Sequence, residues 1–215
     1  MKYLIIILIF LSQNLFSQMD STSYSIGLII AKNLKGQGIS QLDMSSFGQA
    51  VEDVFSGSDY KIPLEDANNR FKAHMESLQK AMDEKYKTEG ENFLAENAKR
   101  PSVVTLSSGL QYEVVKQGEI DKKPGPYDKV KVHYHGTFID GSVFDSSVER
   151  NEPISFPLNG VIPGWQEGLQ LMTVGSKYKL FIPYDLAYGA RGAGNTIKPY
   201  SALIFEVELL AIEKQ

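Results

Sequence analysis

The hydrophobic pattern of the chain changes its period at Pro101, and this change limits the folds that the sequence can adopt. Before Pro101, apolar residues recur at the spacing of one face of an α-helix. After Pro101 they alternate with polar residues, as in strands with one buried face. The sequence therefore predicts an α+β protein, with an all-helical region at residues 18–100 and an antiparallel β domain at residues 101–215.

The helical region contains three predicted helices. One covers residues 23–34 and ends before Gly36, and a second runs from an Asp43 cap to Gly57. A third begins after Pro63 and carries one apolar stripe, formed by Leu64, Ala67, Phe71, Met75, Leu78, Met82 and Tyr86. We expect this helix to fade over residues 89–99 into a linker that ends at Pro101.

The apolar stripe of the third helix needs a partner surface, because three such helices do not close a core by themselves. It could pack on the other domain of the same chain or on a second copy of the chain. We favour the second copy, so the helical region is predicted to form a homodimer.

The first 17 residues have the layout of a secretory signal peptide. Lys2 precedes an apolar run from Tyr3 to Leu11, and Ser17 lies at a suitable cleavage point. The run is too short for a membrane span, which needs about 20 residues. The alternatives are a buried first helix or a short anchor. We expect export to the periplasm or cell envelope of a bacterium, or full secretion, without a stable membrane anchor.

Composition excludes several classes of function. The net charge is -4, with 22 basic and 26 acidic residues spread along the chain. Without a polybasic run, nucleic acid is not an expected partner. The chain has no cysteine, which excludes disulfides, thiolate metal sites and a cysteine nucleophile.

Four segments of the β domain alternate clearly, at residues 110–114, 130–138, 178–182 and 203–209. The one helical segment carries Trp165, Leu169 and Met172, whose spacing directs them toward the apolar face of the sheet. Trp165, the single tryptophan of the chain, is therefore expected between helix and sheet.

Three kinds of site find little support in the sequence. His133 and His135 share one face of a strand, but no third metal ligand of a suitable type lies nearby. The glycine-rich stretch at residues 189–195 precedes a strand, whereas a nucleotide-binding loop precedes a helix, so we interpret it as a hairpin loop. No serine stands in a nucleophile-elbow setting. We expect neither a metal nor a cofactor.

Aromatic residues around one carboxylate suggest a binding cavity instead. Asp145 follows Phe144 directly, and a plain core would not accept this charge unpaired. The other aromatic candidates are Tyr134, Phe156, Trp165, Tyr188 and Phe205. A cavity lined by such rings with one or two polar groups suits a bulky apolar ligand.

The motifs VHYHGTFIDGSVFDSS, GVIPGWQEGLQLMTVGSKYKLFIP, LAYGARG and LIFEVELL resemble, in order and spacing, the FKBP family of peptidyl-prolyl cis-trans isomerases over residues 109–213. The helical half, with SYSIGLIIAKNLKGQGI, is similar to the dimerising region of the macrophage-infectivity-potentiator type. The resemblance implies a half-barrel of antiparallel strands wrapped around a short helix. It also implies that the protein is an enzyme that accelerates X-Pro bond rotation in exported proteins during folding. The alternative is a dimeric holdase chaperone whose isomerase activity is incidental.

The resemblance also implies roles for particular residues. A prolyl ring would lie on Trp165, the Ile162 N–H would meet a substrate carbonyl, and Asp145 and Tyr188 would be the polar groups. Further substrate-binding residues would be Tyr134, Phe144, Phe156, Val161, Ile197 and Phe205, with Arg150 as the basic partner of Asp145. Macrolide inhibitors would bind there too, although Ile154, Ala193 and Thr196 depart from the common family pattern.

Phe144 and Asp145 pose a local conflict. Neighbouring residues of a regular strand point to opposite faces, yet both side chains are assigned to one cavity. We therefore predict a break or bulge in the strand at residues 141–146.

Overall fold

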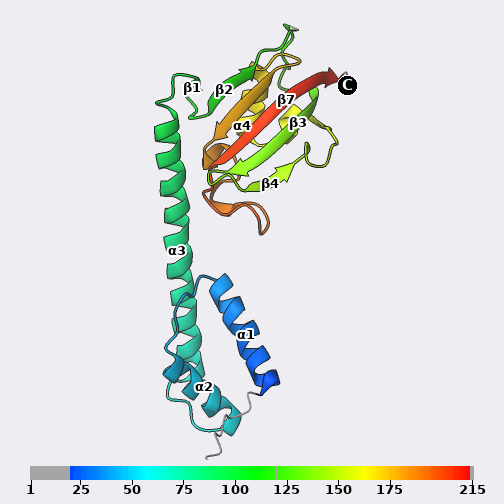
Figure 1. Ribbon diagram of the computed structural model, residues 1–215. Helices are drawn as coiled ribbons and strands as arrows, with labels where there is room; N and C mark the ends of the chain where they lie inside the picture. The colour runs from blue at the N-terminus through cyan, green and yellow to red at the C-terminus, as the bar shows by residue number, and fades with distance from the viewer. Residues whose placement is uncertain (1–19, 120, 214–215) are drawn as a thin grey trace, which may run out of the picture. The chain divides into compact units, whose positions relative to one another are not determined.

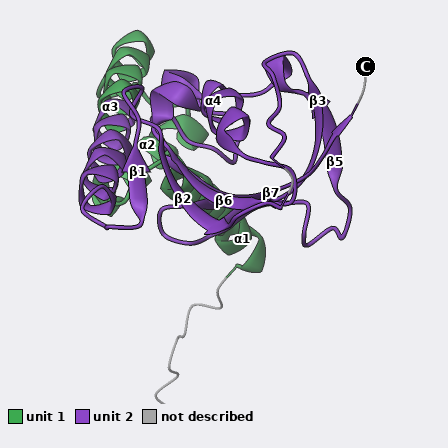
Figure 2. Ribbon diagram, turned by 90° about the horizontal axis from the view of Figure 1, so that it is seen from above, with its two compact units in different colours: residues 1–78 green, residues 79–215 purple. Residues whose placement is uncertain are grey.

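The computed structural model describes residues 20–119 and 121–213, so the predicted signal peptide lies outside the described residues (Figure 1). The chain forms two compact units, one ending at Leu78 and one beginning at Gln79 (Figure 2). The boundary between the units falls inside the long helix α3, Leu64–Asn97. Among the described residues, no helix combines the length and apolar character that a membrane crossing requires.

Unit 1 contains helices α1, Ser21–Gly36, and α2, Met44–Ser56, together with the start of α3. The Asp43 carboxylate accepts a hydrogen bond from the Ser46 N–H at 2.8 Å and caps α2. At the other end of α2, Gly57 adopts a left-handed conformation with φ of 69°, which glycine tolerates without strain. Both predicted ends of the second helix are confirmed.

Helix α3 continues through the segment that was predicted to fade into a linker, and that prediction was wrong. Residues 89–97 remain helical because they pack on the β domain within unit 2. A Cβ atom added at Gly90 would lie 3.0 Å from the Ala202 Cβ, so the helix backbone approaches Ala202 closely. One turn later, the rings of Phe93 and Phe181 lie 6.1 Å apart.

The last turn of α3 is joined to strand β2, Gln111–Lys116, by buried polar groups. The Asn97 amide donates to the Gln111 Oε1 at 2.8 Å, and the Gln111 amide donates to the Leu94 carbonyl at 2.8 Å. Arg100 bonds both Asn97 at 2.9 Å and the Glu113 carboxylate at 2.6 Å. These bonds hold the last turn of α3 against β2.

In the described part of the chain, seven strands form one antiparallel sheet, in the order β1-β2-β6-β7-β3-β4, with β5 also paired to β3. The four segments predicted from alternation are confirmed as β2, β3 (Lys129–Phe138), β6 (Lys177–Ile182) and β7 (Leu203–Glu213). The strand expected at residues 141–146 is β4 (Val143–Ser146). The sequence analysis did not assign the short strands β1 (Val103–Thr105) and β5 (Ile154–Pro157).

Helix α4, Pro163–Leu171, lies on the concave face of the sheet, which curves around it (Figure 2). Two glycines allow this close contact. A Cβ atom at Gly164 would lie 2.4 Å from the Ile182 side chain, and one at Gly168 would lie 2.8 Å from the Leu180 side chain. The helix therefore packs directly on β6, and Trp165 and Leu169 are buried in the core, as predicted.

Candidate active site

A cavity of about 580 Å³ opens beside Trp165, at one end of α4. Residues from β3, β4, β5, α4 and β7 and from the loops at residues 160–162 and 188–197 surround it. Its lining consists of Tyr134, Phe144, Asp145, Ile154, Phe156, Gly160, Val161, Ile162, Trp165, Tyr188, Ala193, Thr196, Ile197 and Phe205. Most of these side chains are apolar, so the cavity suits an apolar group more than a charged one.

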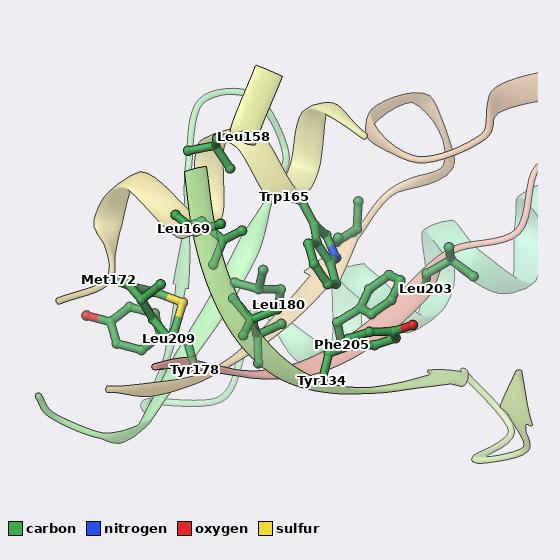
Figure 3. Packing of buried hydrophobic residues seen from close by; sticks show 14 of the residues in the cluster. Tyr134, Leu158, Trp165, Leu169, Met172, Tyr178, Leu180, Leu203, Phe205 and Leu209 are labelled. Atoms are coloured by element: carbon green, nitrogen blue, oxygen red, sulfur yellow. The ribbon is translucent and has the colours of Figure 1, made fainter. Parts of the chain in front are cut away.

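The indole of Trp165 is held by rings on several sides. It meets Phe205 edge to face at 5.0 Å and Tyr134 at 5.4 Å between ring centroids (Figure 3). Phe156 lies at 5.4 Å in a tilted arrangement. Edge-to-face pairs are favourable for aromatic rings, and these contacts leave Trp165 only 5% exposed. The indole is therefore a rigid surface at the base of the cavity.

Strand β4 is bulged where the sequence analysis predicted it. Gly136 pairs with Asp145 and Thr137 pairs with Val143, so Phe144 is an extra residue in β4. A Cβ atom at Gly136 would lie 2.7 Å from the Phe144 ring, so glycine at this position makes room for it. The prediction is confirmed: the bulge lets both Phe144 and Asp145 line the cavity.

The Asp145 carboxylate is the centre of a small polar network. It accepts hydrogen bonds from the Tyr134 hydroxyl and from the Arg150 guanidinium, and Arg150 also donates to the Tyr134 oxygen at 2.9 Å. Partial burial raises the pKa of Asp145, but these hydrogen bonds and the positive charge of Arg150 outweigh it, so the pKa lies below its ordinary value. Asp145 is therefore an anion at neutral pH and a poor general base.

Tyr188 is the second polar residue that the sequence analysis assigned to the cavity, and it lies in the lining. It is 40% exposed, and among the described residues its hydroxyl has no hydrogen-bond partner. Burial and, secondly, the negative charge of Asp145 raise its pKa, so the hydroxyl stays protonated and able to donate.

Ile162 supplies a backbone donor at the start of α4. Its carbonyl accepts hydrogen bonds from Trp165 and Gln166, which begins the helix. Within residues 20–119 and 121–213, its own N–H has no acceptor. This N–H is therefore available to a ligand carbonyl.

The structure brings together nearly all of the site residues predicted from sequence. All of them line the cavity except Arg150, which acts on it through Asp145 and Tyr134. The three departures from the family pattern, Ile154, Ala193 and Thr196, also lie in the lining. Sequence reasoning missed Gly160, which contributes to the wall and has no side chain that could have identified it.

The curved sheet, the short helix on its concave face and the aromatic cavity define the class of protein, and comparison with known proteins agrees. Residues 120–210 match the family described as FKBP-type peptidyl-prolyl cis-trans isomerase. Residues 19–114 match the domain described as amino terminal to FKBP-type peptidyl-prolyl isomerase.

Individual relatives resemble most of the chain. The FKBP-type 22 kDa peptidyl-prolyl cis-trans isomerase of Escherichia coli is 45% identical, over 88% of this chain and 93% of the relative. The outer membrane protein MIP of Legionella longbeachae is 38% identical, over 94% and 88% of the two chains. The crystal structure of FkpA from Escherichia coli superposes with a TM-score of 0.77 at 38% identity, covering 89% of this chain and 93% of that one.

The chain belongs to the family of FKBP-type peptidyl-prolyl cis-trans isomerases. It is an isomerase, and it has the amino-terminal domain found in part of that family. The α+β fold and the family resemblance seen in the sequence are thus confirmed.

Proposed function

We propose that the protein accelerates X-Pro rotation in exported proteins during folding, by holding the prolyl ring against Trp165 in the aromatic cavity. The observation that carries the proposal is the arrangement around the indole, where rings from three strands surround one buried Trp165. A saturated five-membered ring is the apolar group that X-Pro bonds offer to such a cavity.

The physical difficulty of the reaction is the loss of amide resonance. Rotation about the X-Pro bond crosses a barrier of about 18–20 kcal/mol. The twisted amide carries less charge separation than the planar one, so a dry apolar cavity favours it over the planar ground state. Binding of the ring and desolvation of the amide therefore lower the barrier without a covalent intermediate.

The polar groups of the cavity orient the substrate. The free N–H of Ile162 and the Tyr188 hydroxyl are the donors available to substrate carbonyls. Asp145, held by Tyr134 and Arg150, supplies a fixed negative charge beside the rotating amide. In this proposal Asp145, Tyr188, Ile162 and Trp165 act on the bond, and the remaining lining residues shape the cavity. Macrolides that carry a prolyl-like ring would compete for the same cavity.

A protease-coupled assay tests the proposal. The full chain is added to a short X-Pro peptide, and the rate of cis-to-trans conversion is compared with that of Trp165→Ala at equal folded concentration. We expect acceleration by the wild type and its loss in the variant. Equal acceleration by the two proteins would overturn the role given to the indole.

We also propose that unit 1 forms a homodimer. None of the residues of α1 or α2 is buried, although these helices carry many large apolar side chains. Tyr24, Ile26, Leu28, Ile29, Val54 and Phe55 are each more than half exposed. Soluble monomers rarely leave such a surface uncovered, and a second copy of unit 1 supplies a matching one.

The place of action follows from the sequence and not from the described residues. The predicted signal peptide supports export to the bacterial periplasm or envelope. A relative described as an outer membrane protein agrees with an envelope location.

The second candidate function is a dimeric holdase chaperone with incidental isomerase activity, in which apolar surface of unit 1 that the dimer leaves uncovered would bind unfolded chains. An aggregation assay that compares Trp165→Ala with the wild type separates the isomerase function from the holdase function. If this variant, folded but unable to isomerise, protects a proline-free client as well as the wild type does, holding is an independent activity of unit 1. If protection falls with turnover, holding depends on the cavity at Trp165 and unit 1 has no holdase activity of its own.

A further inference from the structure

A second cavity of about 280 Å³ lies within unit 2. It is next to the aromatic cavity at Trp165, which is called the prolyl cavity below. The C-terminal half of α3 forms one wall, with Tyr86 and Glu89. The β3–β4 turn and the segment before β7 complete it, with Phe138, Ile139, Asp140, Ser142, Thr196, Lys198, Ser201 and Ala202.

The wall formed by α3 is held firmly in place. Directly after Glu89, Gly90 meets Ala202 at a distance that leaves no room for a larger side chain. Further along, Phe93 packs on Phe181 and Asn97 bonds Gln111 at 2.8 Å. Because these contacts of α3 outside the cavity hold the helix in place, the wall that α3 gives to the second cavity is part of the folded structure of unit 2.

The two cavities are neighbours, because one lining residue is shared and two aromatic lining residues are in contact. Thr196 lines both, and it lies in a small hairpin closed by two hydrogen bonds between Ala193 and Ile197, of 2.8 and 3.0 Å. A second connection is aromatic: Phe138 lines the second cavity and packs at 5.0 Å against Phe144, which lines the first. A chain that leaves the prolyl cavity over Thr196 therefore meets the second cavity.

The chemistry of the second cavity favours an apolar guest. Its apolar lining residues Tyr86, Phe138, Ile139 and Ala202 are partly or fully buried. The charged groups lie at the exposed rim and have partners within the protein. Asp140 accepts hydrogen bonds from the Ser142 N–H at 2.9 Å and from its hydroxyl at 2.6 Å, and Lys198 donates to the Asn195 carbonyl at 2.9 Å.

We propose that this second cavity binds a bulky apolar side chain of the same client segment whose proline occupies the first cavity. The inference rests on the proposed use of the prolyl cavity and extends it to the residues around the proline. An extended chain advances about 3.3–3.6 Å per residue, so two to six residues on either side of the proline span roughly 7–22 Å, the range that the test below scans. The protein then prefers prolines that neighbour an apolar residue at this distance, as occur in unfolded chains.

The test uses the full chain and peptides of about ten residues with one X-Pro bond in a glycine and serine background. Phenylalanine is placed in turn at each position from two to six residues on either side of the proline. We expect one register to raise kcat/KM roughly ten-fold over the all-glycine/serine peptide, as burial of one large apolar side chain allows.

The blocking variant is Glu89→Trp, which fills the cavity from an exposed helix position, and its matched control is Glu91→Trp on the same helix outside the cavity. Tyr86→Ala removes part of the wall and serves as a second variant. The readout is the ratio of kcat/KM for the phenylalanine and phenylalanine-free peptides within each protein. We expect this ratio to fall to about one in Glu89→Trp and Tyr86→Ala, and to persist in Glu91→Trp.

Two outcomes would overturn the inference while leaving the proposed function intact. One is a wild type that accelerates every peptide equally, and the other is a ratio that persists in both cavity variants. If the wild type accelerated none of the peptides, the proposed function itself would fail, and the inference would fail with it.

Discussion

The hydroxyl of Tyr134 donates a hydrogen bond to the carboxylate of Asp145, so a residue of β3 fixes the negative charge that the bulge of β4 turns into the cavity. Tyr134 also meets the edge of Trp165 at 5.4 Å. One side chain thereby links the apolar base of the cavity to its polar wall.

Asp145 should make folding stability depend on pH at acid values. Its pKa is lowered in the folded protein, so its contribution to stability is present above the ordinary carboxyl pKa of about 3.9 and is lost as the pH falls through the folded pKa. We expect the difference in unfolding free energy between wild type and Asp145→Asn to shrink as the pH falls from about 6 to about 3.

Urea unfolding of both proteins across this range measures the difference, with Asp121→Asn at an exposed position as the control. A difference that stays constant with pH would show that Tyr134 and Arg150 do not favour the charged form of Asp145.

Trp165→Ala should reduce stability and activity together. Removal of a large buried aromatic side chain costs about 3–5 kcal/mol, and the same change deletes the base of the cavity. Leu158→Ala is the control, because Leu158 is fully buried in the same core but does not line the cavity. We expect Leu158→Ala to lose comparable stability while its folded fraction keeps its kcat/KM. A folded Trp165→Ala protein with normal turnover would contradict the proposed base.

The end of α3 should depend on its buried amide pair. Asn97→Ala leaves the Gln111 side chain buried without one of its partners, which costs about 1–3 kcal/mol. Asn92→Ala, at an exposed position of the same helix, should change stability little. Chemical unfolding of the two variants makes the comparison, and equal stabilities would show that the pair does not hold α3 to β2.

The sequence predicted the parts of the fold that depend on local signals. Asp43 and Gly57 marked the ends of α2, and alternation marked the long strands. The last turns of α3 were missed because residues 89–97 are mostly polar, and their helical state depends on contacts with Phe181 and Ala202, which lie far away in the sequence. Strands β1 and β5 were too short for alternation to be visible.

The candidate site was predictable to a similar degree. The motif around Trp165 and the pairing of Phe144 with Asp145 identified the cavity and its bulge. The hydrogen bond between Tyr134 and Asp145 was not predicted, since it depends on the register that the bulge creates. The second cavity could not be predicted from the sequence, because α3 and the segment before β7, which form it, lie far apart in the sequence. The end of α3 was missed for the same reason.

The homodimer proposal predicts that one charge on α1 separates the protomers. Ile29 is 61% exposed within the single chain, and Ile29→Asp would place a carboxylate in the proposed interface. Light scattering should give a dimer mass for the wild type and a monomer mass for the variant at micromolar concentration. Lys32→Glu, at an already charged and exposed position, should remain dimeric. A monomeric wild type would contradict the proposal.

The measurement that tests the central claim most directly is the kcat/KM of Tyr188→Phe in the protease-coupled assay, with unfolding curves to show that the variant is folded. Catalysis by ring binding and desolvation predicts a decrease of roughly ten-fold, about 1.4 kcal/mol, because one hydrogen bond to a substrate carbonyl is lost and the apolar wall remains. A decrease of several orders of magnitude in a folded protein would contradict the account, since it would give the Tyr188 hydroxyl a chemical role in the reaction.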